Sequence, residues 1–347
     1  MTRTGDVASS VQARSGMTIQ AARLHGVRDI RLANEPEAPA GPGDVRVHVT
    51  AVGLCGSDLH WYTEAAIGDA RLDHPLVLGH EFSGRLDDGR LVAADPCIAC
   101  GTCPPCRAGR EHLCTNTRFA GHSTTDGALR STLAWPAALL RPLPASIAEE
   151  QGALLEPLGV ALHAMDLANV QPGERASVLG CGPIGLLIVQ LLRLAGASAI
   201  LASEPLEHRR AAALALGATD STHALADDSR GGHTSPLDVD VAFDAAGTDG
   251  ALADAIDWAA PGGRVVLVGI PEGDRTTFGA AVARRKELSL LFCRRMRSSD
   301  LDRAISLAAD GRVDLEGLIT DRYPLAEAPA AFATLAARTG IKVIVRP

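Results

Sequence analysis

The pattern of apolar and polar residues changes near residue 150. Up to about Arg141, short apolar runs are separated by many Gly and Pro residues, and the stretch Asp44–Leu54 alternates as a half-buried strand does. From Gly152 to Ala168, apolar residues recur at the spacing of a helix. Beyond that helix, short apolar runs alternate with segments of helical periodicity. A β-rich part is therefore expected to precede a part in which strands and helices alternate.

The second part predicts an α/β fold, a parallel sheet with helices on both faces. The predicted strands are residues 176–180, 198–205, 240–247, 262–270 and 341–347, and the predicted helices are 184–196, 206–218 and 301–311. The expected organisation is a flexible N-terminal extension (1–16), a β-rich domain (17–158), an α/β domain (159–298) and a C-terminal part (299–347). We expect a catalytic cleft between the two main domains.

Length and composition narrow the class of protein. A chain of 347 residues usually forms more than one hydrophobic core. A net charge of −8 and an aromatic content of 3% argue against nucleic acid as a partner, and no apolar run reaches the roughly 18 residues of a membrane helix. The segment 1–16 is small and polar, unlike a signal peptide. We therefore expect a soluble, cytoplasmic protein that acts on a small molecule and binds no membrane.

A glycine motif follows the first strand of the α/β part. Residues 180–185 read G-x-G-x-x-G and open the predicted helix 184–196, which is the context in which this motif binds a dinucleotide. The first glycine permits a tight turn, the second lets a pyrophosphate approach, and the third lets the helix pack closely on the strand. The helix N-terminus supplies N–H groups for the phosphates. The expected contacts are Gly180, Gly182, Pro183, Ile184 and Gly185. A glycine-rich turn that binds nothing and a methyltransferase-type fold are the alternatives.

An acidic residue stands where a dinucleotide site requires one. Glu204 ends the second predicted strand, about 20 residues past the glycine motif, where a carboxylate can accept hydrogen bonds from the ribose. A carboxylate there repels a 2′-phosphate, so NAD is favoured over NADP. A basic side chain of His208–Arg210 could instead accept a phosphate, and Arg209 is expected over the adenine or in solvent. Val268 and Ile270 are also expected to contact the cofactor.

Cysteines concentrate in one short segment. Five of the eight lie within residues 97–114, and in a cytosolic chain such a cluster favours metal ligands over disulfides. The spacing C-x2-C-x2-C-x7-C suits a closed tetrahedral zinc site, which would be structural. The expected ligands are Cys100, Cys103, Cys106 and Cys114. Cys97 with the first three of these is an alternative set, and an iron–sulfur site or unligated thiols are further alternatives.

Separate segments carry a second set of zinc ligands. Cys55 lies in the turn after the first predicted strand, His80 and Glu81 follow further along, and Glu156 begins the helix that joins the two parts. A catalytic zinc ion needs three protein ligands and one exchangeable position. Such an ion lowers the pKa of a substrate hydroxyl, and a nicotinamide then accepts the hydride.

Ser57 and His60 stand close to Cys55 and could carry the released proton away. Taken singly, the residues of this set have plainer explanations. Cys55 could be a small buried apolar residue, Asp58 a helix cap, and Glu156 a charge at the start of a helix. The catalytic interpretation depends on their combination with the glycine motif and the cysteine cluster.

Several segments together resemble one enzyme family, the zinc-containing medium-chain dehydrogenases. The resemblance is closest to the polyol branch, typified by sorbitol and idonate dehydrogenases, and runs from about Ala21 to the C-terminus. It rests on GLCGSDLHWY, IGDARLDHPLVLGHEFSG, CGTCPPCRAGREHLC, LLEPLGVALHA and VLGCGPIGLL. It implies a GroES-like catalytic domain and a Rossmann domain with a doubly wound sheet, and residues 299–347 would return to the catalytic domain.

The resemblance also implies the chemistry. Catalytic zinc would be bound by Cys55, His80 and Glu81, and Glu156 would complete the site directly or through water. Ethanol-type enzymes use two cysteines and one histidine, so the glutamate points to a different alcohol. The implied reaction is oxidation of a secondary hydroxyl of a polyol or sugar-like substrate to a ketone, with two zinc ions per subunit and NAD. Members form homodimers or homotetramers through the dinucleotide domain, with 262–270 as the edge strand.

Three departures from the family bear on the substrate. The segment FSGRLDDGRLVAADP is shorter than is usual. Trp61 follows His60 where sorbitol-type enzymes often carry Tyr. FCRRMRSS holds several arginines, and the sequence leaves open whether Arg294 or Arg295 faces the cleft.

Other functions remain open at this point. The same chemistry could act on threonine, 2,3-butanediol or a cyclitol. A zinc-free quinone or enoyl reductase shares the fold but lacks the zinc ligands. A non-catalytic NAD-binding or regulatory protein would bind cofactor and turn over no alcohol.

Overall fold

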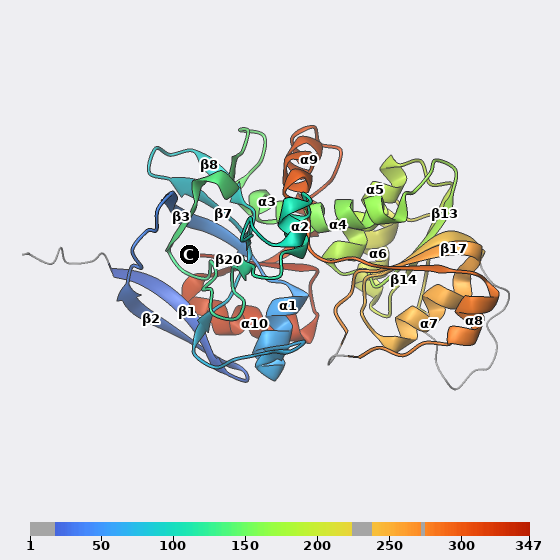
Figure 1. Ribbon diagram of the computed structural model, residues 1–347, viewed down its shortest axis with the longest axis horizontal. Coiled ribbons are helices and arrows are strands. Elements are labelled where there is room, and N and C mark those ends of the chain that lie inside the picture. Colours follow the sequence, from blue (N-terminus) through green and yellow to red (C-terminus); the bar gives the residue numbers. More distant parts are fainter. Residues whose placement is uncertain (1–17, 224–237, 272–274) are drawn as a thin grey trace, which may run out of the picture.

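The computed structural model describes residues 18–223, 238–271 and 275–347, so the predicted extension 1–16 lies outside the described residues. Two bodies lie side by side along the longest axis (Figure 1). One is rich in antiparallel strands, and the other holds a parallel sheet between helices. The α/β class and the β-rich first part are confirmed, whereas the exact domain boundaries remain predictions.

A seven-stranded sheet organises the β-rich body. Its central strand is β3 (Asp44–Gly53), the alternating stretch of the sequence, which buries Val47 and Val49 in the core. This strand pairs antiparallel with β7, β11 and β20. The remaining strands of the sheet are β7 (Glu81–Leu86), β8 (Leu91–Ala94), β11 (Thr132–Pro136), β12 (Leu140–Pro142), β19 (Ile319–Pro324) and β20 (Lys342–Arg346). The turn 87–90 joins β7 to β8 directly, which is the shortened segment noted in the sequence.

Smaller elements complete this body. Short sheets are formed by β1 (Thr18–Gly26), β2 (Asp29–Pro36) and β6 (Leu76–Val77), by β4 (Ala66–Ile67) and β5 (Ala70–Arg71), and by β9 (Cys97–Ile98) and β10 (Arg118–Phe119). Its helices are α1 (Gly56–Glu64), α2 (Pro104–Arg107), α3 (Glu149–Ala153), α10 (Ala328–Ala337) and the 3₁₀ turns Glu111–Leu113, Ala137–Leu139, Glu316–Leu318 and Leu325–Glu327. Trp61, Phe82 and Phe332 are among its largest fully buried side chains.

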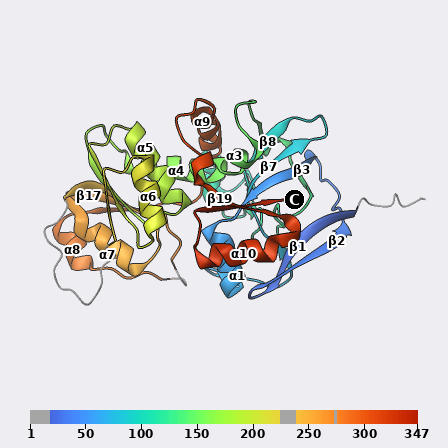
Figure 2. The same ribbon diagram turned by 180° about the vertical axis from the view of Figure 1, so that it is seen from behind.

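The last part of the chain returns to the β-rich body, as the resemblance implied. In Figure 2, α10 and β19 lie in the same body as β1 and β3, which come from the first part of the sequence. The final strand β20 pairs with β3, with Val345 opposite Val52. Residues separated by almost 300 positions of sequence therefore build one sheet.

The second body contains a six-stranded sheet. All of its strands are parallel, in the order β15-β14-β13-β16-β17-β18. The strands are β13 (Arg175–Leu179), β14 (Ala199–Ser203), β15 (Asp220–Thr222), β16 (Val239–Asp244), β17 (Ala259–Leu267) and β18 (Ser289–Phe292). The expectation that 262–270 forms the edge strand is wrong, because the four-residue strand β18 pairs outside β17.

Helices cover both faces of this parallel sheet. Successive side chains of a strand point to opposite faces of the sheet, so each strand contributes to two separate hydrophobic clusters. In β16, Val241 and Phe243 face α5, while Ala242 faces α7. The helices of this body are α4 (Leu155–Ala168), α5 (Pro183–Leu194), α6 (Glu207–Leu216), α7 (Asp249–Trp258) and α8 (Ala280–Arg285), and α9 (Ser298–Ala309) packs on α4 where the two bodies meet. The predicted long helix Gly152–Ala168 is interrupted at Leu154, so that α4 starts one residue before Glu156.

Candidate active site and metal sites

The first candidate site lies where β3 ends and β7 begins. The antiparallel pairing of these strands sets Gly53 opposite Glu81, which brings Cys55 close to His80 and Glu81. One ligand atom from each of these three side chains lies within 4.8 Å of the other two. His80 and Glu81 are buried, and Cys55 is half-buried. A thiolate, an imidazole and a carboxylate at this spacing fit a zinc ion that keeps one exchangeable position.

Asp58 connects the two segments that carry these ligands. Cys55 is the N-cap residue of α1, and the Asp58 carboxylate accepts a hydrogen bond from the Cys55 N–H at 2.9 Å. The other carboxylate oxygen accepts a hydrogen bond from the Gly79 N–H at 3.3 Å and lies 3.7 Å from His80 Nδ1. Burial opposes the charged form of His80, but the charges of Asp58 and Cys55 outweigh burial and raise its pKa. Asp58 therefore does more than cap a helix, because it orients a predicted metal ligand.

A buried lysine lies beside the same group. Lys342 of β20 forms an ion pair with Glu81, and its ammonium also donates a hydrogen bond to the Leu54 carbonyl at 2.9 Å. A side chain on Gly53 would clash with both partners of this pair and would have to displace one of them. The charge of Glu81 raises the pKa of Lys342 against the effect of burial. Sequence reasoning missed Lys342, which lies in a strand that reads only as apolar.

Glu156 does not join the three-residue group. It is buried in the first turn of α4, and burial raises its pKa to about 7. The charges of His80 and Glu81 act on it in opposite directions, so it lies near them without sharing their tight spacing. The structure thus brings together three of the four expected ligands.

The two residues expected to carry the proton differ in position. Ser57 Oγ lies 3.4 Å from His80 Nε2, beside the three-residue group. His60 lies one turn further along α1 and pairs with Glu64 at 2.8 Å. The structure contains no hydrogen bond between Ser57 and His60 themselves.

Aromatic and basic side chains form the wall next to His80. The centres of the His80 and Phe119 rings lie 5.3 Å apart, and the Arg295 guanidinium lies over the Phe119 ring at 4.5 Å from its centre. His122 packs edge-on against Trp61 at 5.5 Å. The sequence left open whether Arg294 or Arg295 faces the cleft, and Arg295 is the one whose side chain lies at this wall. Neither Phe119 nor His122 was singled out from the sequence, because neither belongs to a motif.

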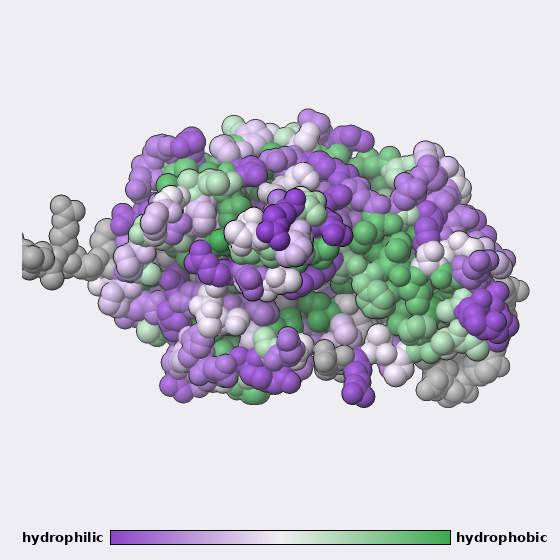
Figure 3. All heavy atoms as spheres, in the orientation of Figure 1, coloured by the Kyte–Doolittle hydropathy of each residue, from purple (hydrophilic) through white to green (hydrophobic). Residues whose placement is uncertain are grey.

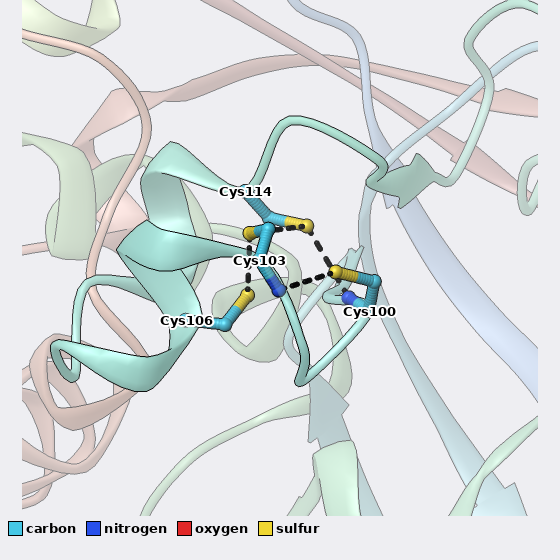
Figure 4. Close-up of side chains that lie close together, drawn as sticks. All are labelled: Cys100, Cys103, Cys106 and Cys114. Atoms are coloured by element: carbon cyan, nitrogen blue, oxygen red, sulfur yellow. Dashed lines mark hydrogen bonds between the residues drawn. The ribbon is translucent and has the colours of Figure 1, made fainter.

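The second metal site is the cysteine cluster. One sulfur from each of Cys100, Cys103, Cys106 and Cys114 lies within 4.8 Å of the others, and Figure 4 shows the four side chains pointing toward one another. A tetrahedral zinc site with Zn–S bonds of about 2.3 Å places sulfurs roughly 3.8 Å apart. Here Cys103 Sγ lies 3.3 Å from Cys106 Sγ and 3.9 Å from Cys114 Sγ. The donor set therefore fits zinc with no position left for a substrate.

Local hydrogen bonds favour the thiolate form of Cys100, but not that of Cys106. The Cys100 N–H donates to Cys114 Sγ at 3.2 Å, and the Cys103 N–H donates to Cys100 Sγ at 3.4 Å. Hydrogen bonds from the Thr102 hydroxyl and from the backbone N–H groups of Thr102 and Cys103 lower the pKa of Cys100 to about 6, whereas burial raises the pKa of Cys106 to about 12. Cys97 stays outside the cluster, where its sulfur lies 3.2 Å from Thr117 Oγ1. The structure therefore favours the expected set over the alternative that includes Cys97.

The glycine motif forms the turn between β13 and α5. Gly180 has a φ of +92°, and a side chain on Gly185 would collide with the Gly180 carbonyl. A side chain on Gly182, by contrast, would meet only the tip of Arg209 at 3.9 Å. The space over Gly182 and the start of α5 at Pro183 fit a pyrophosphate at the helix N-terminus. Ile184 is half-buried in the first turn of this helix.

The remaining cofactor candidates gather at the carboxyl edge of the same sheet. Glu204 directly follows β14 and is buried, with its two oxygens accepting hydrogen bonds from the N–H groups of Cys181 and Leu206 at 2.8 and 3.0 Å. Val268 and Ile270 follow β17 at this edge. Arg209 donates to the Gly340 carbonyl at 2.7 Å, and its expected contact with the adenine stays a prediction.

Comparison with known proteins agrees with this geometry. Residues 41–145 match the family model for the alcohol dehydrogenase GroES-like domain, and residues 183–310 match that for zinc-binding dehydrogenases. The chain is 35% identical to a probable D-xylulose reductase A of Aspergillus clavatus, over 93% of this chain and 95% of that protein. It is 31% identical to a sorbitol dehydrogenase of Bacillus subtilis, over 88% of this chain and 90% of that protein.

Solved structures give the same result. L-Idonate 5-dehydrogenase from Escherichia coli superposes with a TM-score of 0.88 at 27% identity, over 95% of this chain and 99% of the other. The expected GroES-like and Rossmann fold and the oxidoreductase class are confirmed. This chain belongs to the zinc-binding dehydrogenases with a GroES-like domain, in the branch that contains the polyol dehydrogenases.

Proposed function

We propose that this protein oxidises a secondary hydroxyl group of a polyol or sugar-like substrate to a ketone and transfers the hydride to NAD. The observation that carries the proposal is the group Cys55, His80 and Glu81, whose ligand atoms lie within 4.8 Å of one another. The family and the names of its relatives support an alcohol as substrate.

The residues around the group have separable tasks in this reaction. A zinc ion bound there would supply the Lewis acidity that lowers the pKa of the substrate hydroxyl. Asp58 holds His80 and the backbone of Cys55 in place, and Lys342 holds Glu81. The Ser57 hydroxyl, 3.4 Å from His80, stands where it can accept the proton of the alcohol. We assign His60, on the same helix, the later transfer of that proton toward solvent.

The turn at the start of α5 and the carboxylate of Glu204 support NAD as the cofactor. When NAD is bound, its nicotinamide accepts the hydride. The Glu204 carboxylate already holds the glycine loop through the Cys181 N–H. A negative charge at this position would repel the 2′-phosphate of NADP, so we propose a preference for NAD.

The edge of the parallel sheet supports a homodimer or homotetramer. Within the described residues, β18 has no strand on its outer side, and its last residue, Phe292, is 69% exposed. Figure 3 shows hydrophobic residues on the surface of the second body as well. An exposed edge with apolar side chains is suited to pairing with a second copy. No helix among the described residues is long and apolar enough to cross a membrane.

Zinc analysis combined with a substrate screen tests the proposed function. Purified protein should contain about two zinc ions per chain and should reduce NAD with at least one polyol of a panel that includes threonine, 2,3-butanediol and cyclitols. If threonine were the only substrate of the panel that is oxidised, the proposed substrate class would be wrong, but the proposed chemistry would stand. Cofactor binding without turnover of any alcohol would instead favour a regulatory protein.

A further inference from the structure

Arg209 links the two bodies of the molecule beside the cofactor candidates. This half-buried residue belongs to α6 of the second body. Its Nη2 and Nε atoms both donate to the Gly340 carbonyl, at 2.7 and 3.2 Å, in the segment that leads into β20 of the β-rich body. Of the residues that the structure describes, none offers Arg209 a carboxylate at hydrogen-bond distance. The backbone of the other body is therefore the main partner of this cation.

The third nitrogen of the Arg209 guanidinium lies toward the glycine loop. Nη1 has no hydrogen bond to a described residue, and a Cβ placed on Gly182 would lie 3.9 Å from it. Gly182 is the position at which the motif lets a pyrophosphate approach, directly before the N-terminus of α5. A guanidinium carries donors on all three of its nitrogens, so it can serve two partners at once. Arg209 can thus keep the Gly340 carbonyl on one side and bind a phosphate oxygen on the other.

The peptide that Arg209 contacts is held in place by its neighbours in the β-rich body. A side chain on Gly340 would collide with Thr320 and Asp321 of β19, so the segment lies close against that strand. The next N–H group, that of Ile341, donates to Thr320 Oγ1 at 2.9 Å. From there, β19 and β20 pair in parallel. Ordering of the Gly340 peptide therefore also orders the start of β20.

The start of β20 carries the lysine that holds a predicted metal ligand. Lys342 lies two positions after Gly340 and forms the buried ion pair with Glu81. A continuous series of contacts thus leads from the glycine loop through Arg209 and the Gly340 peptide to Lys342 and Glu81. Such a series can couple two sites when occupation of one changes the order of the other.

We propose that Arg209 is a positioning residue that couples occupation of the cofactor site to the ion pair of Lys342 and Glu81. When Nη1 binds a phosphate of the dinucleotide, the guanidinium loses its remaining freedom, and the Gly340 peptide and the start of β20 become more ordered. The inference rests on the proposed function only in that the glycine motif binds a dinucleotide. It differs from a contact with the adenine, because it requires a partner in the other body. The coupling is reciprocal, so an ordered β20 also strengthens cofactor binding.

Amide hydrogen exchange with two cofactor fragments tests this coupling without turnover. ADP-ribose keeps the pyrophosphate of NAD, whereas adenosine has none. In the zinc-loaded protein, saturating ADP-ribose should slow the exchange of amides in residues 341–346 by at least about fivefold, and saturating adenosine by less than about twofold. Equal protection by both fragments would overturn the proposal. Binding of ADP-ribose without protection of this segment would also overturn it and leave the proposed function intact. Absence of any ADP-ribose binding would overturn both the proposal and the assignment of the glycine motif.

Variants of Arg209 separate this role from that of a merely structural contact. Arg209→Gln should reduce the protection by ADP-ribose to less than about twofold and weaken its binding about ten- to hundredfold, the effect of one charge-assisted hydrogen bond. Arg209→Lys should retain part of both effects. Arg210→Gln is the matched control and should keep the protection, because Arg210 is the next residue of α6 but donates to the carbonyls of Glu204 and Pro205 in its own body. If Arg209→Gln lowered the protection no more than Arg210→Gln does, the proposal would be wrong.

Thr320→Ala tests the same series of contacts from the other body. The change removes the hydroxyl that accepts from the Ile341 N–H and leaves Arg209 intact. Thr320 is exposed, so the fold should tolerate this substitution. We expect the protection of residues 341–346 by ADP-ribose to fall at least about twofold. Full protection in this variant would show that the Gly340 peptide does not carry the coupling and would overturn the proposal.

Discussion

The buried lysine beside the predicted zinc ligands gives a sharp test of how that site is held together. Lys342 and Glu81 are each 1% exposed and form an ion pair, and the lysine also donates to the Leu54 carbonyl. Lys342→Met keeps most of the aliphatic side chain but removes the charge and its donors. We expect a large loss of stability in the metal-free protein, because Glu81 would remain as an unpaired buried charge.

The magnitude follows from these contacts. Removing one partner of a buried ion pair costs about 3–5 kcal/mol, and a buried carbonyl that loses its donor costs about 1–3 kcal/mol. Because one ammonium group serves both partners, the losses overlap, and we expect about 3–5 kcal/mol in total. The double variant Lys342→Met/Glu81→Gln should recover roughly 2 kcal/mol of this loss, since an amide needs no counter-charge.

Urea unfolding of the chelator-treated protein, followed by circular dichroism, measures these differences. Lys286, the only other lysine of the sequence, provides the control, because its ammonium donates to three backbone carbonyls near the end of α7. Lys286→Met should cost about 1–2 kcal/mol, and Glu81→Gln should not restore it. A loss below about 1 kcal/mol for Lys342→Met, or no recovery in the double variant, would refute the reasoning.

Four further outcomes are expected. Cys55→Ala should abolish turnover and leave about one zinc ion per chain by elemental analysis; wild-type turnover would contradict the catalytic assignment. Cys106→Ser should lower the thermal midpoint more than it lowers kcat, and an unchanged midpoint would contradict the structural zinc site. Glu204→Ala should reduce the preference for NAD over NADP in kcat/KM, and an unchanged ratio would remove Glu204 from that role. Burial raises the pKa of Glu156 from the ordinary 4.5 to about 7. Between these two pH values, Glu156 is protonated in the folded metal-free protein but ionised in the unfolded chain. The free energy of unfolding, measured with urea, should therefore fall by about 3 kcal/mol as the pH rises from about 4.5 to about 7, and Glu156→Gln should remove that fall. Equal pH profiles of the two proteins would be evidence against a buried, ionisable Glu156.

The sequence predicted the local parts of the two metal sites better than their surroundings. The cysteine cluster lies within residues 97–114, so its spacing alone nearly determines which thiols can meet. Cys55, His80 and Glu81 come together because two neighbouring strands pair in register, which the resemblance to a family implied. The edge of the parallel sheet was predicted wrongly, because β18 has only four residues and no distinct alternation.

Buried charges were the hardest feature to predict from the sequence. Asp58 could be weighed only as a helix cap, since its contact with His80 depends on how β7 enters the sheet. Lys342 stands in an apolar strand, where its long side chain gives no sign that its ammonium is buried. The contact of Arg295 with Phe119 depends on how the two bodies pack against each other. Nothing in the sequence around Arg295 distinguishes it from Arg294.

The position of Lys342 also has a consequence for how the site forms. It donates to the Leu54 carbonyl across 288 positions of sequence, and its strand β20 pairs with β3 immediately before Cys55. Residues 41–145, which match the GroES-like family model, contain all three grouped ligands but not the cation that pairs with Glu81. Until the last strand is in place, Glu81 would have to stay hydrated or bind the metal without its partner, because an unpaired carboxylate is costly to bury. The active site is therefore completed by contacts of very long sequence separation, whose formation requires the closure of a long loop at a cost in conformational entropy.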